Sequence, residues 1–332
     1  MSEKSQVGMP QADPMRVEDD GAVRRRRTPP AGARFDWMER PDGVRVRVAL
    51  WDARGDDRRG TVVILHGWRE FIEKYFETVA DLLDRGFGVA TMDWRGQGLS
   101  SRPLADRHKG HAASFDANVD DVRALMTMVQ DALPGPYFLM AHSFGGHCAL
   151  RYLHDEPGMV ERAVLLAPMI GIDLHGFPEA MARGLVAVAR WFRFDRAYAL
   201  FQGQYSEEAR RRQASLLTSD PERFEDEIAA YRANPELALG GVTYGWLGAA
   251  FDSIDKLRAP GFAEAITTRL MVVLAGCERV VDNRAAKRFC RRLPNARIVE
   301  ITGARHEILR ERDELREQFW AAFDEFMDRA GV

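Results

Sequence analysis

The residue in this sequence best suited to covalent chemistry is Ser143, which directly follows an apolar run and precedes a helical pattern. A serine hydroxyl acts as a nucleophile when a sharp strand-to-helix turn holds it beside a base, and such a turn needs very small residues two positions before and after the serine. Ala141 and Gly145 occupy these positions, with alanine where glycine is usual. Serine between small residues is also common at ordinary helix starts, where it caps backbone N–H groups. The role of Ser143 therefore depends on what the rest of the chain places beside it.

Acidic residues and a histidine follow the last two apolar runs of the chain. Glu278 and Asp282 come after the run at 270–275, and His306 comes after the run at 296–301. The order serine, acid, histidine is one of the known chain orders of a catalytic triad. In a triad the histidine takes the serine proton and returns it to the leaving group, while the carboxylate fixes the imidazole tautomer. The pattern of residues leaves open which of the two acids would do this.

Acyl transfer also needs two hydrogen-bond donors for the oxyanion of the tetrahedral intermediate. In a strand–turn–helix site these are the backbone N–H of the residue after the nucleophile, here Phe144, and one from an earlier loop, best assigned to Trp68. His142 and His147 flank the serine, and we expect them to pack or form hydrogen bonds rather than to act as the base. Neither a nucleotide or flavin motif nor metal-ligand spacing is found, so we expect no cofactor and no metal ion.

The elements that must position these residues alternate along the chain. A period-2 pattern from Val44 to Leu50 indicates a strand with one buried face, and we expect it at the edge of a sheet. A continuous apolar run at 61–65 indicates a parallel strand covered on both faces, and further strands are indicated at 87–92, 137–142, 163–167, 270–275 and 296–301. Helical stripes at 72–83, 115–129, 148–153 and 315–326 follow or separate these runs. The alternation predicts an α/β fold with a mostly parallel, doubly wound sheet.

Between Pro168 and Pro260 the alternation stops and the segment indicates helices. One stripe contains Met181, Leu185, Val188 and Phe192, which we expect to pack against the protein. Another helix is expected to start at Pro221, after Ser219 and Asp220. The sequence thus predicts a first core part at 34–168, a helical cap insertion at 169–260 and a second core part at 261–332.

Composition limits the remaining possibilities. A net charge of −3 and a pI near 6.3 offer no overall basic surface for nucleic acid. Residues 1–33 are rich in proline around the run Arg24–Arg27, which is typical of a disordered, solvated arm, with contact to an anionic membrane surface as the alternative. The three cysteines are expected to be buried thiols of a cytosolic protein, and no apolar run approaches the roughly 18 residues of a membrane span. We expect a cytoplasmic protein, with transient contact to the inner membrane face left open.

Five stretches together resemble a known family, the α/β-hydrolase branch of serine aminopeptidase-like hydrolases that includes monoacylglycerol lipases and bacterial lysophospholipases. The resemblance covers roughly residues 35 to 328, with alanine at 141 and lysine at 74 as departures from the family pattern. The stretches are His66–Tyr75, Asp93–Ser100, Ala141–Gly145, Glu278–Asp282 and Gly303–Ile308. The resemblance implies an α/β-hydrolase fold with a helical cap, and it favours Glu278 over Asp282 as the acid.

The same resemblance implies a serine hydrolase that cleaves the carboxylic ester of a single-chain lipid, a lysophospholipid or a monoacylglycerol, through an acyl-enzyme. Hydrolysis of small esters, peptides or thioesters remains an alternative, as does a binding protein of the same fold without activity. A single-chain lipid is mostly apolar, so its enzyme needs an apolar cavity over Ser143. We expect the insertion to supply its walls, with Trp191, Phe192, Tyr244 and Trp246 as candidates, although these aromatic residues would also serve to pack the insertion on the core. The oligomeric state cannot be inferred from the sequence.

Overall fold

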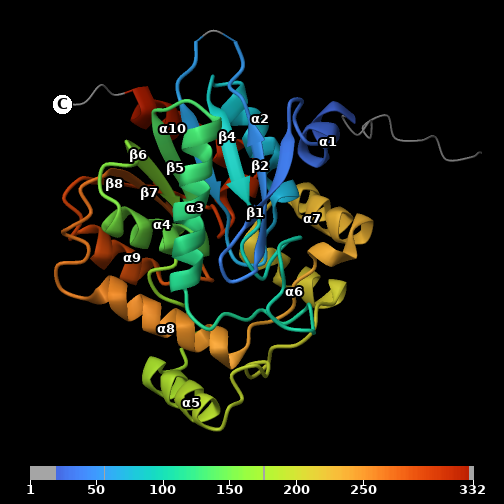
Figure 1. Cartoon of the computed structure of the whole chain (residues 1–332), viewed down its shortest axis with the longest axis vertical. Coiled ribbons are helices and arrows are strands. Elements are labelled where there is room, and N and C mark those ends of the chain that lie inside the picture. Colours follow the sequence, from blue (N-terminus) through green and yellow to red (C-terminus); the bar gives the residue numbers. More distant parts are fainter. Residues whose placement is uncertain (1–19, 56, 175, 329–332) are drawn as a thin grey trace, which may run out of the picture.

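The computed structural model describes residues 20–55, 57–174 and 176–328, and one sheet lies at its centre (Figure 1). The strand order in the described part of the chain is β1-β2-β4-β3-β5-β6-β7-β8. All neighbours from β4 to β8 are parallel, whereas β2 pairs antiparallel with both β1 and β4. The strands are β1 Arg34–Glu39, β2 Arg45–Trp51, β3 Thr61–Leu65, β4 Gly88–Met92, β5 Tyr137–His142, β6 Arg162–Leu166, β7 Arg269–Ala275 and β8 Ala296–Ile301. The predicted doubly wound, mostly parallel sheet is confirmed.

The predicted position of the first strand is wrong. The segment containing Val44 to Leu50 forms β2, which lies inside the sheet because β1 pairs along its outer side. Every residue of β2 from Val46 onward is buried, including Arg47. In β1, a strand of six residues, only Met38 is buried. The edge position therefore belongs to β1, a strand that the sequence analysis did not predict.

Helices cover both faces of the sheet (Figure 1). On one face α3 (Asp116–Ala132) lies beside α4 (Phe144–Asp155), and Arg123 of α3 forms ion pairs with Asp155 and Glu156. On the other face lie α10 (Asp313–Asp328) and α2 (Phe76–Leu83), which are linked by an ion pair between Arg316 of α10 and Asp81 of α2. The strands β3, β4 and β6 are buried at every position, as expected for strands covered on both sides.

The insertion after β6 consists mainly of four helices, which gather at one end of the sheet (Figure 1). They are α5 (Glu179–Trp191), α6 (Glu207–Leu217), α7 (Pro221–Ala233) and α8 (Tyr244–Arg258). Asp220 caps α7 by accepting hydrogen bonds from the N–H groups of Glu222 and Arg223, and Pro221 follows it at the first helical position. The helices α6 and α7 share a small apolar core of their own with Phe71, whereas Trp246, Ala249 and Leu257 of α8 belong to the main core. The insertion is thus divided between two cores.

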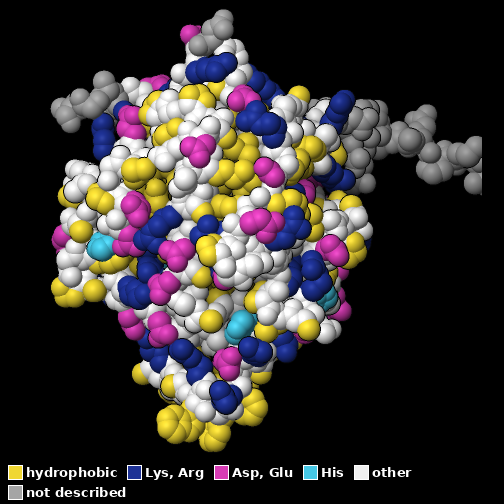
Figure 2. Space-filling model, viewed as in Figure 1, with side chains coloured by type: hydrophobic (Ala, Val, Ile, Leu, Met, Phe, Trp, Pro, Cys, Tyr) yellow, Lys and Arg dark blue, Asp and Glu magenta, His cyan; other side chains and the backbone are white. Residues whose placement is uncertain are grey.

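The apolar stripe of α5 faces solvent rather than the protein, which corrects the expectation of packing. Met181, Leu185, Val188 and Phe192 are all exposed, and the buried side chains of α5 are Val186 and Ala189. A period of 3.6 residues identifies an apolar face, but it does not say on which side of the helix the protein lies. Figure 2 shows this apolar face at the lower tip of the molecule.

The N-terminal expectation is also wrong in part, because residues 20–27 form the helix α1 (Asp20–Arg27). Its arginines pair with acids far away in the sequence: Arg25 with Asp81 and Asp84 at the end of α2, and both Arg26 and Arg27 with Asp226 of α7. Of the predicted disordered arm at 1–33, residues 1–19 lie outside the described residues. A charge run indicates a solvated segment only when no complementary acids meet it, and the distant acids on α2 and α7 do. None of the described helices is long and apolar enough to span a bilayer.

We predict that Arg26→Met lowers the free energy of unfolding by about 3 kcal/mol, because it leaves the nearly buried Asp226 with one cation fewer. The measurement is thermal or urea unfolding followed by circular dichroism. Arg24→Met is the matched control, since Arg24 is exposed and forms no ion pair with a described residue. Equal stabilities of the two variants would show that α1 contributes nothing to holding α7.

Candidate active site

The turn at Ser143 joins the end of β5 to the start of α4 and holds the serine in an unusual backbone conformation. Its φ of 52° lies in the left-handed region, which non-glycine residues rarely adopt. The hydrogen bond from the Ser143 N–H to the Leu166 oxygen, 2.9 Å, fixes this turn against β6. A Cβ atom at position 145 would lie 2.1 Å from the Leu65 oxygen, so only glycine fits there. Glycine at 145 is thus a steric requirement of the turn.

The three residues that the sequence analysis singled out for acyl transfer lie in one hydrogen-bonded row. His306 Nε2 is 2.9 Å from Ser143 Oγ, and His306 Nδ1 is 2.9 Å from Glu278 Oε2. The side chains of His306 and Glu278 are nearly inaccessible to solvent. Burial raises the pKa of Glu278, but His306 and the N–H groups of Val280 and Val281 outweigh this effect and hold the pKa below its usual value. The row therefore ends in an ionised carboxylate.

The structure separates the two candidate acids by their local surroundings. Asp282 caps α9 (Asn283–Cys290), accepting hydrogen bonds from the N–H groups of Arg284 at 2.8 Å and Ala285 at 3.0 Å. It makes no hydrogen bond to His306, which is held by Glu278. Aspartate directly before a helix is a preferred N-cap because its oxygen satisfies free N–H groups of the first turn. The geometry thus favours Glu278, as the resemblance implied.

The backbone N–H groups of Trp68 and Phe144 remain available near Ser143, because no described residue accepts a hydrogen bond from either. The loop that carries Trp68 is held by residues of the stretch Asp93–Ser100. Gln97 accepts a hydrogen bond from the Arg69 N–H at 2.6 Å, and Asp93 accepts one from the Ile72 N–H at 2.9 Å. The side chains of Asp93 and Gln97 thus hold the backbone of the loop after β3 in place.

A second layer of polar residues lies behind this row, and sequence reasoning missed most of it. His142 contacts the carboxylate of Glu70 through Nδ1 at 3.2 Å and the backbone oxygen of His306 through Nε2 at 3.0 Å. Burial alone would lower the pKa of His142, but the carboxylate of Glu70 more than offsets this and raises the pKa. Glu70 also accepts hydrogen bonds from the Gly67 N–H and from Tyr75 Oη. One carboxylate therefore braces both the loop of Trp68 and the backbone of His306.

The other histidines close to the serine have structural roles, as expected for His147. His147 contacts the Met169 oxygen and Ser253 Oγ, and burial lowers its pKa to about 4. His66 lies fully buried in the loop after β3, where burial likewise lowers its pKa to about 4. Both rings are therefore neutral at pH 7.

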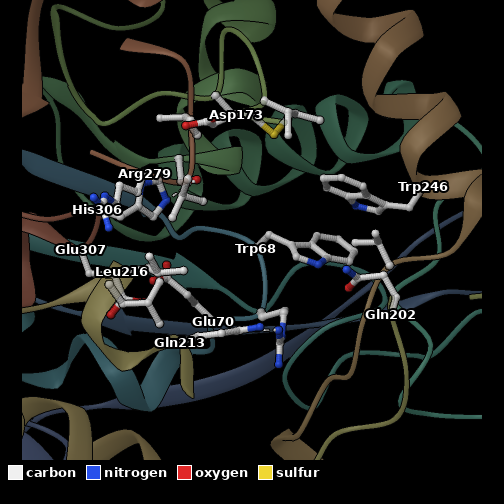
Figure 3. Close-up of a pocket in the computed structure, with 18 of the residues that line it drawn as sticks. Trp68, Glu70, Asp173, Gln202, Gln213, Leu216, Trp246, Arg279, His306 and Glu307 are labelled. Atoms are coloured by element: carbon white, nitrogen blue, oxygen red, sulfur yellow. Dashed lines mark hydrogen bonds between the residues drawn. The ribbon is translucent and has the colours of Figure 1, made fainter. Parts of the chain in front are cut away.

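A cavity of about 440 Å³ opens above Ser143 and His306, and Figure 3 shows the residues around it. Of the four predicted wall residues, only Trp246 lines this cavity, where its ring packs against Trp68 with centroids 4.7 Å apart. Tyr244 begins α8 outside the lining, and Trp191 and Phe192 point into solvent with exposed fractions of 84% and 65%. The other apolar wall residues were not named individually in the sequence analysis, but most of them come from the insertion, as expected. Those of the insertion are Met169, Ile172, Leu174, Leu200, Leu216, Leu217, Val242 and Leu247, and Val280 and Val281 come from the stretch Glu278–Asp282.

Comparison with known proteins agrees with this geometry. Residues 56–313 match the protein family described as "Serine aminopeptidase, S33". The chain belongs to this family. Lysophospholipase L2 from Escherichia coli (strain K12) is 35% identical to it over 299 residues, covering 87% of this chain and 85% of the relative. Monoacylglycerol lipase from Mycolicibacterium smegmatis is 26% identical over 81% of this chain and 88% of the relative.

Solved structures share the fold of this family member. A soluble variant of monoglyceride lipase from Saccharomyces cerevisiae superposes with a TM-score of 0.70 at 18% sequence identity, covering 89% of this chain and 94% of that chain. A monoacylglycerol lipase from Paleococcus ferrophilus gives a TM-score of 0.66 at 22% identity, over 86% of this chain and 99% of that one. The resemblance noted in the sequence and the α/β-hydrolase fold that it implied are confirmed.

We predict that Glu278→Gln lowers kcat about 10³- to 10⁴-fold, because a neutral amide no longer stabilises the imidazolium of His306. Asp282→Asn is the matched control, and it should lower kcat less than about tenfold because asparagine also caps helices well. Both variants are assayed on a soluble carboxylic ester, with circular dichroism to verify folding. The opposite ranking in two folded variants would assign the acid to Asp282.

Proposed function

We propose that this protein is a serine hydrolase that cleaves the carboxylic esters of single-chain lipids, lysophospholipids or monoacylglycerols, through an acyl-enzyme. The observation that carries the proposal is the hydrogen-bonded row from Glu278 through His306 to Ser143 at the base of a largely apolar cavity. Lysophospholipase L2, with 35% identity over most of both chains, supports the lipid class of the substrate.

In the proposed reaction, His306 Nε2 takes the proton from Ser143 Oγ as this oxygen attacks the ester carbonyl carbon. The negative charge that develops on the carbonyl oxygen is stabilised by the N–H groups of Trp68 and Phe144. Protonated His306, held by Glu278, then gives its proton to the departing glycerol oxygen, which leaves an acyl group on Ser143. A water molecule, deprotonated by His306, attacks the acyl carbon, and the fatty acid departs as the serine recovers its proton.

Two other functions remain to be distinguished by experiment: hydrolysis of peptides or thioesters, and ligand binding without catalysis. A peptidase or thioesterase of the same fold would use the same row on a different leaving group, so the substrate panel below distinguishes it. A binding protein without activity would have no need for a serine, a histidine and a carboxylate joined by hydrogen bonds. It would fail to react with an active-site probe.

We further propose that the enzyme meets its substrate at a lipid surface through the exposed apolar face of α5 and the segment after it. This face contains Met181, Leu185, Val188, Trp191, Phe192, Phe194, Leu200 and Phe201, the last of them entirely exposed. Contiguous apolar surface of this kind marks an interaction site in a soluble domain. Leu200 belongs both to this face and to the lining of the cavity, so the two are continuous.

The charges around the α5 face favour an anionic lipid surface as its partner. Arg193 and Arg196 are exposed and form no ion pair with a described residue. Cations beside exposed aromatic and aliphatic side chains are typical of segments that lie in the headgroup region of a bilayer. The expected contact is peripheral, with the cavity opening toward the lipid.

We predict that a fluorophosphonate probe labels the wild-type protein and not Ser143→Ala. The same variant should lower kcat about 10⁴- to 10⁶-fold on whichever ester is turned over, because members of a triad act as a unit. The assay panel contains a lysophospholipid, a monoacylglycerol, an aminoacyl amide and a thioester. Absence of labelling would favour a binding protein, and a folded, active Ser143→Ala would exclude the mechanism.

We predict that Phe201→Ser weakens binding to vesicles that contain anionic lipid about tenfold, which corresponds to the loss of one buried aromatic side chain. Sedimentation with the vesicles gives the partition coefficient. Ile298→Ser is the matched control, since Ile298 is also exposed but lies on the edge strand β8. Equal loss in both variants, or no binding by the wild type, would contradict the lipid-surface proposal.

A further inference from the structure

The cavity above Ser143 contains an arginine, Arg69, that the proposed reaction does not use. It follows Trp68 in the loop after β3, and both residues line the cavity. Its guanidinium donates hydrogen bonds to two neutral oxygens, Leu239 O and Gln213 Oε1, each at 3.2 Å. No described carboxylate forms an ion pair with it. Most of the N–H groups of this guanidinium are therefore left for another acceptor.

Arg69 is the unmatched charge of a larger ionic cluster. Arg210 donates two hydrogen bonds to Glu227, and Lys74 Nζ lies within 3.3 Å of Glu70, Glu227 and Glu307. With Arg310, whose Nε is 3.8 Å from Glu307, the cluster holds three cations against three carboxylates. Arg69 adds a fourth positive charge on the cavity side without a fourth acid.

The fold holds Arg69 in place at an energetic cost. Its φ of 63° lies in the left-handed region, and the backbone is fixed by Gln97, which accepts from its N–H, and by Tyr231, which donates to its oxygen. Burial lowers the pKa of the guanidinium to about 10, and the positive charge of Arg210 contributes to the same effect. Burial also acts to lower the pKa of Arg210, but the direct contact with Glu227 outweighs it, so the pKa of Arg210 is raised. A strained backbone that carries an uncompensated charge is typical of a binding position rather than of a packing one.

We propose that Arg69, together with Gln213, binds the phosphate group of a lysophospholipid while the ester lies at Ser143. This inference rests on the proposed function and specifies its substrate as a glycerophospholipid. A guanidinium can bind two phosphate oxygens at once, and an amide N–H₂ adds a further donor. Because Arg69 directly follows Trp68, a substrate whose carbonyl oxygen meets the Trp68 N–H has its glycerol phosphate within reach of the guanidinium.

The lining of the cavity is consistent with an anion at this position. Figure 3 shows Gln202 and Gln213 on the same side of the cavity as Trp68, away from the carboxylate of Asp173. Glu70 and Glu307, which also line the cavity, are both paired with Lys74. The phosphate thus meets donors on this side, while the apolar side chains of the remaining wall are left for the acyl chain.

The test compares 1-lauroyl-lysophosphatidylglycerol with 1-lauroylglycerol, which share the acyl ester and differ in the phosphoglycerol group. We predict that Arg69→Gln lowers kcat/KM about 10- to 100-fold more for the lysophospholipid than for the monoacylglycerol, as expected for the loss of charge-assisted hydrogen bonds. Arg69→Lys keeps the positive charge but cannot bind two phosphate oxygens with one planar group, so it should retain part of the activity on the lysophospholipid that Arg69→Gln loses. Arg212→Met is the matched control, because Arg212 lies beside Gln213 on the exposed side of α6 and should change neither rate.

A second measurement identifies the anion without relying on turnover. Calorimetry with Ser143→Ala should detect binding of glycerol 3-phosphate that Arg69→Gln abolishes, whereas hexanoate should not bind in an Arg69-dependent manner. Equal losses for both esters in a folded Arg69→Gln, or Arg69-dependent binding of hexanoate alone, would overturn the phosphate subsite. Hydrolysis of the monoacylglycerol but not of the lysophospholipid by the wild type would also overturn it, while leaving the hydrolase function intact. If neither ester is cleaved, the proposed function fails, and the calorimetry still decides the subsite.

Discussion

The buried ammonium group of Lys74 is the interaction on which the arrangement of the site depends. It pairs with Glu70 behind the loop of Trp68, with Glu307 directly after His306, and with Glu227 of the cap helix α7. Burying a carboxylate is costly unless a cation and hydrogen bonds compensate, so these three acids are held where Lys74 can reach them. The donor loop, the histidine loop and the cap are thus fixed relative to one another by a single charge. Lysine at 74 was noted as a departure from the family pattern, and here it contacts all three acids.

The sequence predicted those parts of the site that depend on local patterns. Ser143 follows a strand whose apolar run is visible without any tertiary information, and His306 follows the last strand of the chain. Parallel strands bring their carboxyl ends to one edge of the sheet. The choice between Glu278 and Asp282 was harder, because α9 is a helix of only eight residues and Asp282 could not be recognised as its cap from the turn alone. The resemblance to a family supplied the preference that local chemistry could not.

The predictions failed where one sequence pattern is compatible with two different arrangements in space. The stripe of α5 was identified correctly as apolar, yet whether it faces the protein or the solvent is set by what α8 presents to it. The arginine run was treated as solvated because its partners, Asp81 and Asp226, lie about 55 and 200 residues further along the chain. The contacts between Glu70 and His142 could not be predicted either, since they depend on the loop after β3, the end of β5 and the loop of His306 meeting in space. Local periodicity contains none of this information.

The two ends of the cap are attached by different kinds of contact. The helix α7 is held by the buried pair of Asp226 with Arg26 and by an apolar core, whereas α5 buries little more than Val186 and Ala189. Its ion pairs to α8 are Arg183 with Asp255, Arg190 with Asp252 and Glu179 with Arg258, and their side chains are partly open to water. Dissolved salt weakens the attraction between exposed charges, with a Debye length of about 8 to 10 Å at physiological ionic strength, but it affects buried ion pairs little. The attachment of α5 therefore weakens with ionic strength while that of α7 does not, so the salt concentration of the medium acts selectively on the part of the cap that carries the exposed apolar face.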